Sequence, residues 1–208
     1  MEAGAWLIFV ASSLALITVP GQDMVLVMSR SLAAGPRAGV ATAAGVSVGL
    51  VGHSVLAALG LGALLRASEW LFTGIKLAGA AYLAWLGIGL LRAGATHLAL
   101  STGTVRSLRR SFADGAVSNL GNPKIAVFYF AYLPQFVPAD TSHPALAVLA
   151  LGIVFAALTF VVKGPVGLSA GLLSGWLRAR PAALAWIYRA SGLVMIGLGM
   201  RLLFERRD

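Results

Sequence analysis

Six long apolar stretches constrain this chain more than any other feature, because together they take up most of its 208 residues. They cover residues 5–28, 38–65, 70–91, 115–137, 145–173 and 182–204. A hydrocarbon layer about 30 Å thick requires roughly 20 apolar residues of helix per crossing, so each stretch is long enough to span it. Backbone groups must be paired in lipid, and the sequence lacks the alternating pattern of β-barrel strands. We therefore predict an all-α membrane protein with six transmembrane helices.

The composition leaves little room for anything else, with 59% hydrophobic and 11% charged residues. We expect a single transmembrane domain over residues 1–208, surrounded by membrane lipid. The net charge of +9 would suit nucleic acid, but short connecting segments offer no broad water-facing surface, so nucleic acid is not an expected partner. The sequence has no metal-ligand cluster, phosphate-binding loop or nucleophile elbow. We accordingly predict neither an enzyme nor a bound cofactor or metal.

The arginines indicate an orientation, because all thirteen lie near the ends of the apolar stretches. One side of the membrane would carry Arg30, Arg37, Arg92, Arg106, Arg109, Arg110, Arg178, Arg180 and Arg189, and the other Arg66, Arg201, Arg206 and Arg207. The positive-inside rule then places both termini outside the cytoplasm. A bias toward alanine, glycine and arginine is typical of GC-rich bacteria, so we predict a multi-pass protein of the bacterial inner membrane.

Two helix-breaking sites divide the chain into halves, since Pro20 and Pro123 are 103 residues apart. Each half contains three apolar stretches, of which the first is interrupted. Three crossings per half predict two inverted three-helix repeats, at about 1–92 and 112–208, joined by a loop at about 93–111. Broken helices at matching positions of such repeats indicate a binding site near the membrane midplane.

Small residues are spaced for close helix packing at Gly45, Gly49, Gly167, Gly171 and Gly175. We favour packing within one chain over a homodimer, because a small bundle must first pack its own helices. A homodimer is the alternative.

Apart from Arg189 and Arg201, which are counted above with the stretch ends, the charged residues inside the apolar stretches are the three lysines and one of the seven acidic residues, Asp23. Each such charge costs roughly 2.5–3.5 kcal/mol at the centre of a helix, so it implies a partner, water or a function. Asp23 is the best candidate for a cation or proton site, and helix capping or a structural ion pair with a lysine is the alternative. Lys124 is the candidate for holding an anionic group, helped by backbone N–H groups freed at Pro123.

The remaining polar candidates each have a structural alternative. His53 is either a proton relay or a hydrogen-bonded packing residue, and Asn119 and Asn122 either bind substrate or satisfy backbone groups near Pro123. Tyr82 suits interfacial packing better than a ligand cage. The candidate substrate- and ion-binding residues are Pro20, Gly21, Gln22, Asp23, Lys76, Asn119, Asn122, Pro123 and Lys124, followed by His53, Lys163 and Tyr82.

Several of these residues lie in motifs that resemble those of the lysine exporter and homoserine/threonine-resistance translocators, the LysE/RhtB family. The motifs are residues 19–23, 76–83, 119–124 and 128–136. The resemblance implies efflux of amino acids or related metabolites across the inner membrane, driven by an ion gradient. Gln22 stands where the family usually has a second proline, and Lys163 matches no family position that we can assign.

We therefore predict a secondary-active exporter of amino acids or close derivatives, with alternating access around the breaks at Pro20 and Pro123 and a proton as coupling ion. A zwitterionic substrate would present its ammonium to Asp23 and its carboxylate to Lys124. One alternative is an exporter of a cation or other toxic small solute, which the positive interior disfavours. Another is a non-transporting membrane scaffold, which would have no need for a broken helix in each half.

Overall fold

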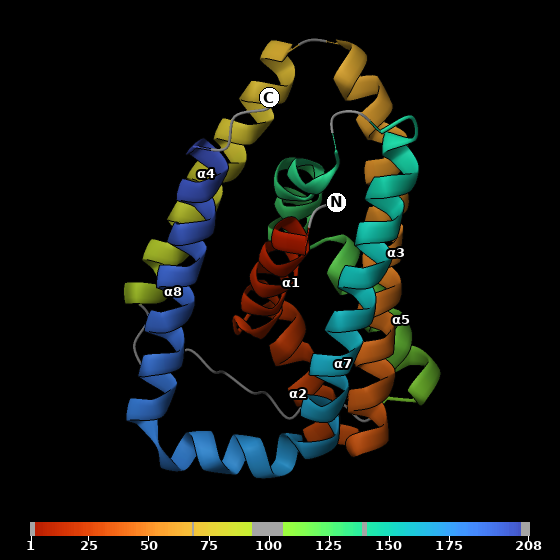
Figure 1. Ribbon diagram of the computed structural model, residues 1–208. Coiled ribbons are helices and arrows are strands. Elements are labelled where there is room, and N and C mark those ends of the chain that lie inside the picture. Colours follow the sequence, from red (N-terminus) through yellow and green to blue (C-terminus); the bar gives the residue numbers. More distant parts are fainter. Residues whose placement is uncertain (1–2, 68, 93–105, 139–140, 205–208) are drawn as a thin grey trace.

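The chain folds into helices in a computed structural model that describes residues 3–67, 69–92, 106–138 and 141–204 (Figure 1). The elements are α1 (Ala3–Thr18), α2 (Gln22–Ala34), α3 (Pro36–Ala67), α4 (Glu69–Arg92), α5 (Leu108–Leu120), α6 (Pro123–Val127), the π-helical turn η2 (Phe128–Tyr132), the 3-10 turn η3 (Leu133–Phe136), α7 (Pro144–Ala179) and α8 (Pro181–Phe204). Most of the predicted connecting loop lies outside the described residues, as do Arg206 and Arg207.

Among the residues that the structure describes, four helices are long and apolar enough to cross a membrane, and they confirm a multi-pass all-α protein. These spans are Pro36–Gly60, Thr73–Arg92, Pro144–Leu177 and Ala182–Phe204. A fifth span is available if α1 and α2 are one broken crossing, since their axes meet at 52°. The fourth apolar stretch is instead divided among α5, α6 and two short turns, so length and composition recover four or five of the six predicted crossings.

The first helix break follows from Pro20 and Gly21. Proline has no N–H to donate and disfavours helical backbone at the preceding residue, so α1 cannot run into α2. Gly21 adopts an extended conformation before α2 begins at Gln22. A methyl group on Gly21 would stand 3.3 Å from Nζ of Lys124, so the absence of a side chain lets the second broken segment approach closely.

The second break has a similar local cause. Helix α5 ends at Leu120, and Asn122 takes an extended backbone conformation with φ −85° and ψ 108°. Pro123 then occupies the first position of α6, where its missing N–H costs nothing. The Asn122 side chain accepts a hydrogen bond from the backbone N–H of Lys124, which caps the new helix.

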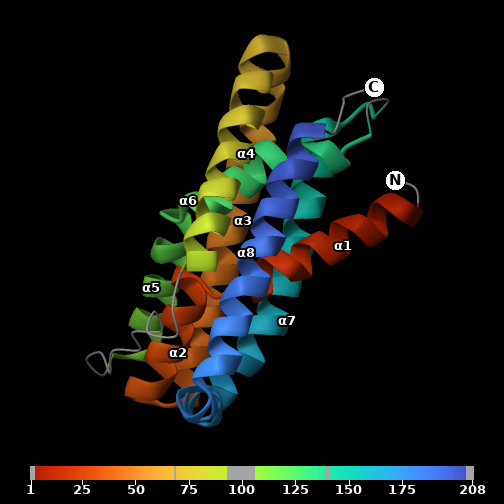
Figure 2. The ribbon, with the colours of Figure 1, turned by 90° about the vertical axis from the view of Figure 1, so that its left-hand side faces the viewer.

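The three most extensive helix contacts each join one chain half to the other. Helix α3 packs along α5 and α7, α2 contacts α3 and α7, and α4 packs along α8. The colours in Figure 1 show that α3 and α7 run in opposite directions, and that α4 and α8 do too. We call α2, α3, α5 and α7 the frame, and α4 with α8 the arm. Figure 2 shows the arm from its outer side, with α1 running obliquely past it.

Helix α7 does not keep one direction over its 36 residues. Its C-terminal part turns across the base of the molecule before α8 begins (Figures 1 and 2). Pro165 lies inside α7, and a proline there removes one helical hydrogen bond and crowds the preceding turn. The bend therefore has a local cause close to Lys163.

The frame is packed so closely that glycines touch backbone atoms of neighbouring helices. A methyl group on Gly45 would overlap the Phe112 backbone, and one on Gly39 would stand 2.8 Å from the Gly167 carbonyl oxygen. Ser31 Oγ also donates to that carbonyl at 2.6 Å. Small residues permit this approach, as the spacing predicts. A methyl on either Gly171 or Gly175 would meet nothing within 4 Å in the described part of the chain, and a homodimer stays a prediction.

The close contact between α3 and α5 can be tested with Gly45→Ala. Because the added methyl meets backbone rather than a movable side chain, we expect the free energy of unfolding to fall by about 1–3 kcal/mol. The matched control is Gly197→Ala on α8, where a methyl meets no described atom within 4 Å. Alanine is the better helix former, so this control should be unchanged or slightly more stable. Thermal unfolding of both purified variants measures the difference, and equal midpoints would contradict the contact.

Candidate functional site

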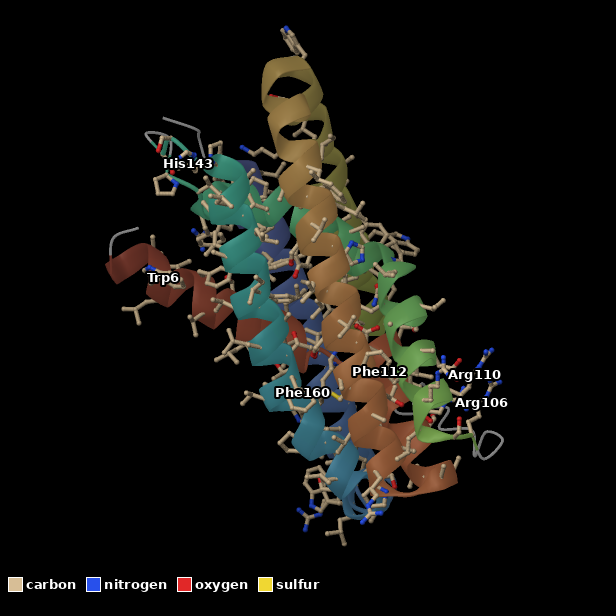
Figure 3. The ribbon with its side chains drawn as sticks, turned by 90° about the vertical axis from the view of Figure 1, so that its right-hand side faces the viewer. Trp6, Arg106, Arg110, Phe112, His143 and Phe160 are labelled. Carbon is tan, nitrogen blue, oxygen red and sulfur yellow. The ribbon has the colours of Figure 1, made fainter. Side chains whose placement is uncertain are left out.

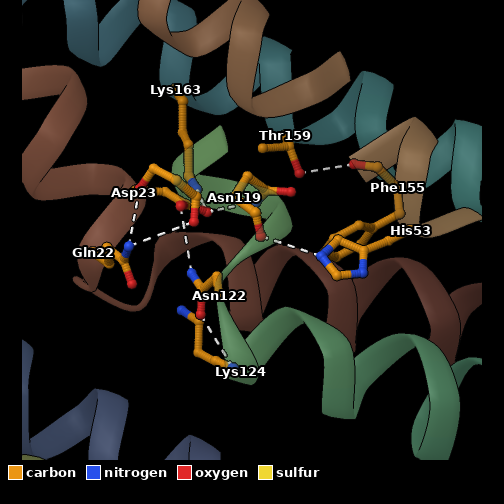
Figure 4. Close-up of polar contacts among 10 residues, drawn as sticks. Gln22, Asp23, His53, Asn119, Asn122, Lys124, Phe155, Thr159 and Lys163 are labelled. Carbon is orange, nitrogen blue, oxygen red and sulfur yellow. Dashed lines mark hydrogen bonds and ion pairs between the residues drawn. The ribbon is translucent and has the colours of Figure 1, made fainter. Parts of the chain in front are cut away.

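Asp23 is the centre of a buried polar cluster that joins three parts of the chain (Figure 4). Its side chain lies in the first turn of α2 and the residue is 3% exposed. Asn119 Nδ2 donates to Oδ2 at 2.8 Å, and Asn122 Nδ2 donates to Oδ1 at 3.3 Å. Lys163 Nζ lies 3.2 Å from Oδ2. The carboxylate thus has three donors, one of them charged, as a buried ion needs.

Asp23 pairs with Lys163, a lysine that the sequence did not single out as its partner. Lys163 comes from α7 and is 5% exposed, so its ammonium also needs this partner. An ion pair with a lysine was the structural alternative for Asp23, and this is the arrangement found. The sequence places one acidic residue and three lysines inside the apolar stretches. This composition predicts that Asp23 pairs with a lysine, but it does not show which of the three.

His53 holds the end of α5 in place beneath this cluster. Its Nε2 lies 3.1 Å from the backbone oxygen of Asn119, which can only accept, so Nε2 carries the hydrogen and donates. The imidazole also stacks on the ring of Tyr129, with centroids 5.5 Å apart. The same carbonyl accepts from the backbone N–H of Asn122 at 2.9 Å, so His53 adds a second donor at the end of α5. This contact suits a positioning residue for Asn119.

Lys124 lies at the second break with its ammonium beside Gly21. The residue is half-buried, and its Nζ makes no hydrogen bond or ion pair with the described residues. The backbone N–H that we expected to help hold an anion is already donated to Asn122. Helix α6 has only five residues, so it adds no substantial dipole. The side-chain ammonium is therefore the group available to an anion here.

A cavity of about 600 Å³ lies beside the first break, between the frame and the arm. Its walls include Pro20, Gly21 and Gln22 from the break and Trp85, Arg92 and Tyr188 from the arm, together with Val25, Leu86, Ile88, Gly89 and Leu90. A pocket of this size with mostly apolar walls is typical of a small-molecule site. Sequence reasoning did not select Trp85 or Tyr188 for the site, because an aromatic residue on an apolar helix gives no signal of which cavity it faces.

Two predicted candidates lie apart from the Asp23 cluster. Lys76 is half-buried on α4, nine residues before Trp85, which corresponds to roughly 13 Å of helix rise. The Tyr82 ring packs against Trp85 with centroids 5.7 Å apart, so it supports the cavity wall. The other ten candidates lie at the two breaks or contact residues there, while Lys76 is placed toward the far end of α4.

Gln22 connects the two breaks at the position where a second proline was expected. Its Nε2 donates to Ser118 Oγ at 3.0 Å, one residue before Asn119. A proline could not make this contact. The side chain therefore ties the start of α2 to the end of α5, next to the paired Asp23.

An ion-pair network joins the same two helices on the side that carries most of the arginines. Asp114 Oδ2 lies 2.9 Å from Arg30 Nη2 and 3.4 Å from Arg106 Nη1, and Oδ1 lies 3.2 Å from Arg110 Nε. Figure 3 shows Arg106 and Arg110 at the end of the molecule opposite His143. Sequence reasoning used these arginines only as an orientation signal and did not select Asp114.

A layer of aromatic rings fills the interior on the other side of the breaks. Phe9 of α1 packs on Phe136 of η3 with centroids 5.4 Å apart, and Arg201 of α8 donates to the Tyr132 hydroxyl at 3.2 Å. The rings in this layer are Phe9, Phe128, Tyr129, Tyr132, Phe136 and Phe155, all of which are buried. The breaks therefore have a cavity on one side and close packing on the other.

Comparisons with known proteins identify the family of this chain. The sequence model of a family described as LysE type translocator matches residues 14–206. The chain is 33% identical to the homoserine/homoserine lactone efflux protein of Salmonella typhimurium over 97% of both chains. It is 32% identical to an uncharacterized membrane protein of Vibrio cholerae, over 97% of this chain and 98% of the relative. The leucine efflux protein of Klebsiella pneumoniae is 26% identical over 95% of this chain and 93% of its own. No solved structure matches the chain significantly.

A double-mutant cycle tests the buried ion pair. Lys163→Met leaves the Asp23 carboxylate buried without its charged partner, and we expect the free energy of unfolding to fall by about 3–5 kcal/mol. Adding Asp23→Asn removes the uncompensated charge, so the double variant should recover much of that loss. Thermal or denaturant unfolding of the two single variants and the double variant gives the coupling. Additive losses would show that the pair contributes nothing specific.

Proposed function

Because this chain belongs to the LysE type translocator family, we propose that it exports amino acids or their close derivatives across the bacterial inner membrane by secondary-active transport. One observation carries the proposal, namely the cavity of about 600 Å³ at the first helix break. Its wall residue Gly21 lies beside the Lys124 ammonium, which makes no hydrogen bond or ion pair with the described residues. The names of the Salmonella and Klebsiella relatives support the same substrate class, since they are a homoserine/homoserine lactone efflux protein and a leucine efflux protein.

Substrate recognition in this proposal begins at Lys124. A carboxylate entering the cavity past Gly21 would meet the ammonium and form a charge-assisted hydrogen bond in apolar surroundings. The apolar walls from α4 and α8 would accept an aliphatic side chain. A cation has no comparable place, because the carboxylate of Asp23 is already paired with Lys163. This pairing favours an amino acid over a cation or other toxic small solute.

We further propose that the single domain consists of two inverted repeats, at about 1–92 and 112–208. The helix directions support it, since α3 and α7 run in opposite directions, as do α4 and α8. The contacts support it as well, because each of these helices packs along its counterpart in the other half. The sixth crossing would then be the broken segment from α5 through η3. Matched helix breaks are what a transporter requires and a membrane scaffold does not.

Alternating access would move the arm relative to the frame. The cavity lies between these two groups and is bordered by Arg92, which belongs to the arginine-rich side. The aromatic layer closes the other side. This arrangement fits a state that is open toward the cytoplasm and ready to load substrate. We propose a proton as the coupling ion and Asp23, the buried acid at the break, as its carrier; taking up the proton would neutralise the carboxylate and release Lys163 from the ion pair.

Export itself can be tested in cells that are fed dipeptides to raise their internal amino-acid pools. Lys124→Gln removes the charged partner of the substrate carboxylate, which is worth about 1.5–3 kcal/mol, so export should fall about 10- to 100-fold. Arg37→Gln, an exposed change at the start of α3, is the control and should retain export. Mass spectrometry of the medium measures both. Unchanged export by Lys124→Gln would exclude this role, and no export by the wild type in the membrane would exclude the function.

The proposed orientation has a separate test. From the excess of arginines we propose that the arginine-bearing ends of α2 and α5 and the α7–α8 turn face the cytoplasm, and that α1 begins and α8 ends outside it. Alkaline phosphatase fused to the C-terminus should therefore be active, and green fluorescent protein at the same position should be dark. The reverse result would place both termini in the cytoplasm.

A further inference from the structure

We infer that Lys163 acts as a built-in ammonium group that occupies the acidic subsite of the transport site. The protein would then recognise its substrate by the carboxylate and reject substrates that carry an additional positive charge. This inference rests on the proposed export function and concerns its selectivity. It departs from the sequence-based expectation, in which Asp23 binds the ammonium of the substrate.

The first argument is that Asp23 is enclosed and already paired with a cation. Its two oxygens receive donors from Asn119, Asn122 and Lys163, which come from different elements, and only 3% of the residue is exposed. A substrate ammonium could reach this carboxylate only by displacing the Lys163 ammonium. The cavity walls contain Gly21 and Gln22 but not Asp23 itself. Lys124 is not a wall residue either, but its ammonium lies beside the wall residue Gly21, so the substrate carboxylate is placed at that part of the wall.

The second argument is that Lys163 is held in place by the frame. Gly167 lies one helical turn further along α7, where its carbonyl accepts from Ser31 and its backbone touches Gly39. This contact fixes α7 against both α2, which carries Asp23, and α3. An ammonium on an anchored helix has little translational freedom left to lose, whereas a dissolved ammonium loses much of it on binding. The Lys163 ammonium therefore binds Asp23 at a lower entropic cost than the ammonium of a free substrate does.

The third argument is the charge of the cluster. With Asp23, Lys124 and Lys163 all ionised, the cluster carries one net positive charge before substrate binds. A zwitterion leaves that charge unchanged and a simple carboxylate neutralises it, whereas a dibasic amino acid raises it by one. Like charges repel strongly where water is scarce, so the dibasic substrate is disfavoured. Without Lys163 the empty cluster would be neutral, and a substrate with one net positive charge would bring it to the total that the wild type has with a zwitterion bound.

Competition experiments with the wild type test this selectivity directly. Purified protein in liposomes exchanges labelled leucine, and the competitors are N-acetyl-leucine, leucinamide and lysine. N-acetyl-leucine keeps the carboxylate and lacks the ammonium, so we expect it to compete within about threefold of leucine. Leucinamide and lysine should compete at least about tenfold more weakly. Leucinamide or lysine competing as well as leucine would overturn the inference.

Variants of Lys163 test whether removing its ammonium lets the protein accept a cationic substrate. Lys163→Met should strengthen competition by lysine about tenfold or more, because Asp23 becomes available to a cation. Lys163→Arg keeps the charge and should retain the wild-type selectivity. In the double variant Asp23→Asn/Lys163→Met, the competition by lysine should disappear again. Unchanged selectivity in a folded Lys163→Met protein would contradict the proposed role.

A binding measurement separates this inference from the export function. Lys163→Ala vacates space beside Asp23, so n-butylammonium chloride should raise its melting temperature by about 2–4 °C relative to sodium chloride. The variant Asp23→Asn/Lys163→Ala should show no such shift. Absence of the shift in Lys163→Ala would overturn the ammonium subsite. A clear shift in a protein that exchanges no amino acid would instead overturn the export function and leave the subsite intact.

Discussion

The ion pair between Asp23 and Lys163 is the interaction on which the centre of this protein depends. In lipid neither ion could be buried alone, and the two amides of Asn119 and Asn122 complete the set of donors to the carboxylate. The four side chains come from α2, α7 and the second break, so the pair fixes segments that the apolar sequence alone would leave free to slide. Both helix breaks are stable because their polar groups meet here.

This junction determines how the rest of the bundle is divided. The frame is held by the ion pair, by glycine contacts and by the Asp114 network, whereas the arm is the internally packed pair of α4 and α8. The boundary between frame and arm contains the cavity and does not coincide with the boundary between the two chain halves. Each group takes helices from both halves. A movement between frame and arm would therefore open the site without separating the two breaks.

Much of this organisation could be predicted from the sequence, because its main signals are local. The length of the apolar stretches predicts membrane crossings, and proline next to glycine predicts both helix breaks. Asp23, Asn119 and Asn122 stand out as polar residues beside these breaks. The choice of Lys163 as the partner of Asp23 could not be predicted, since it depends on how α7 packs against α2. The walls formed by Trp85 and Tyr188 depend on helix rotation, to which an evenly apolar helix gives no guide. Hydropathy also could not show that the fourth stretch divides into short helices and turns.

The contact between α3 and α5 has a consequence for the timescale of motion in this protein. At Gly45 the touching atoms belong to backbone on both helices, so the interface has no side-chain rotamers to exchange there. Interfaces of interlocked side chains can adjust by many small steps, each of them fast. The backbone contacts of α3 with α5 extend from Thr42 to Gly49, whereas Gly52 faces the Leu120 side chain. Over that range the two helices lack such intermediate steps and should move together during a transport cycle.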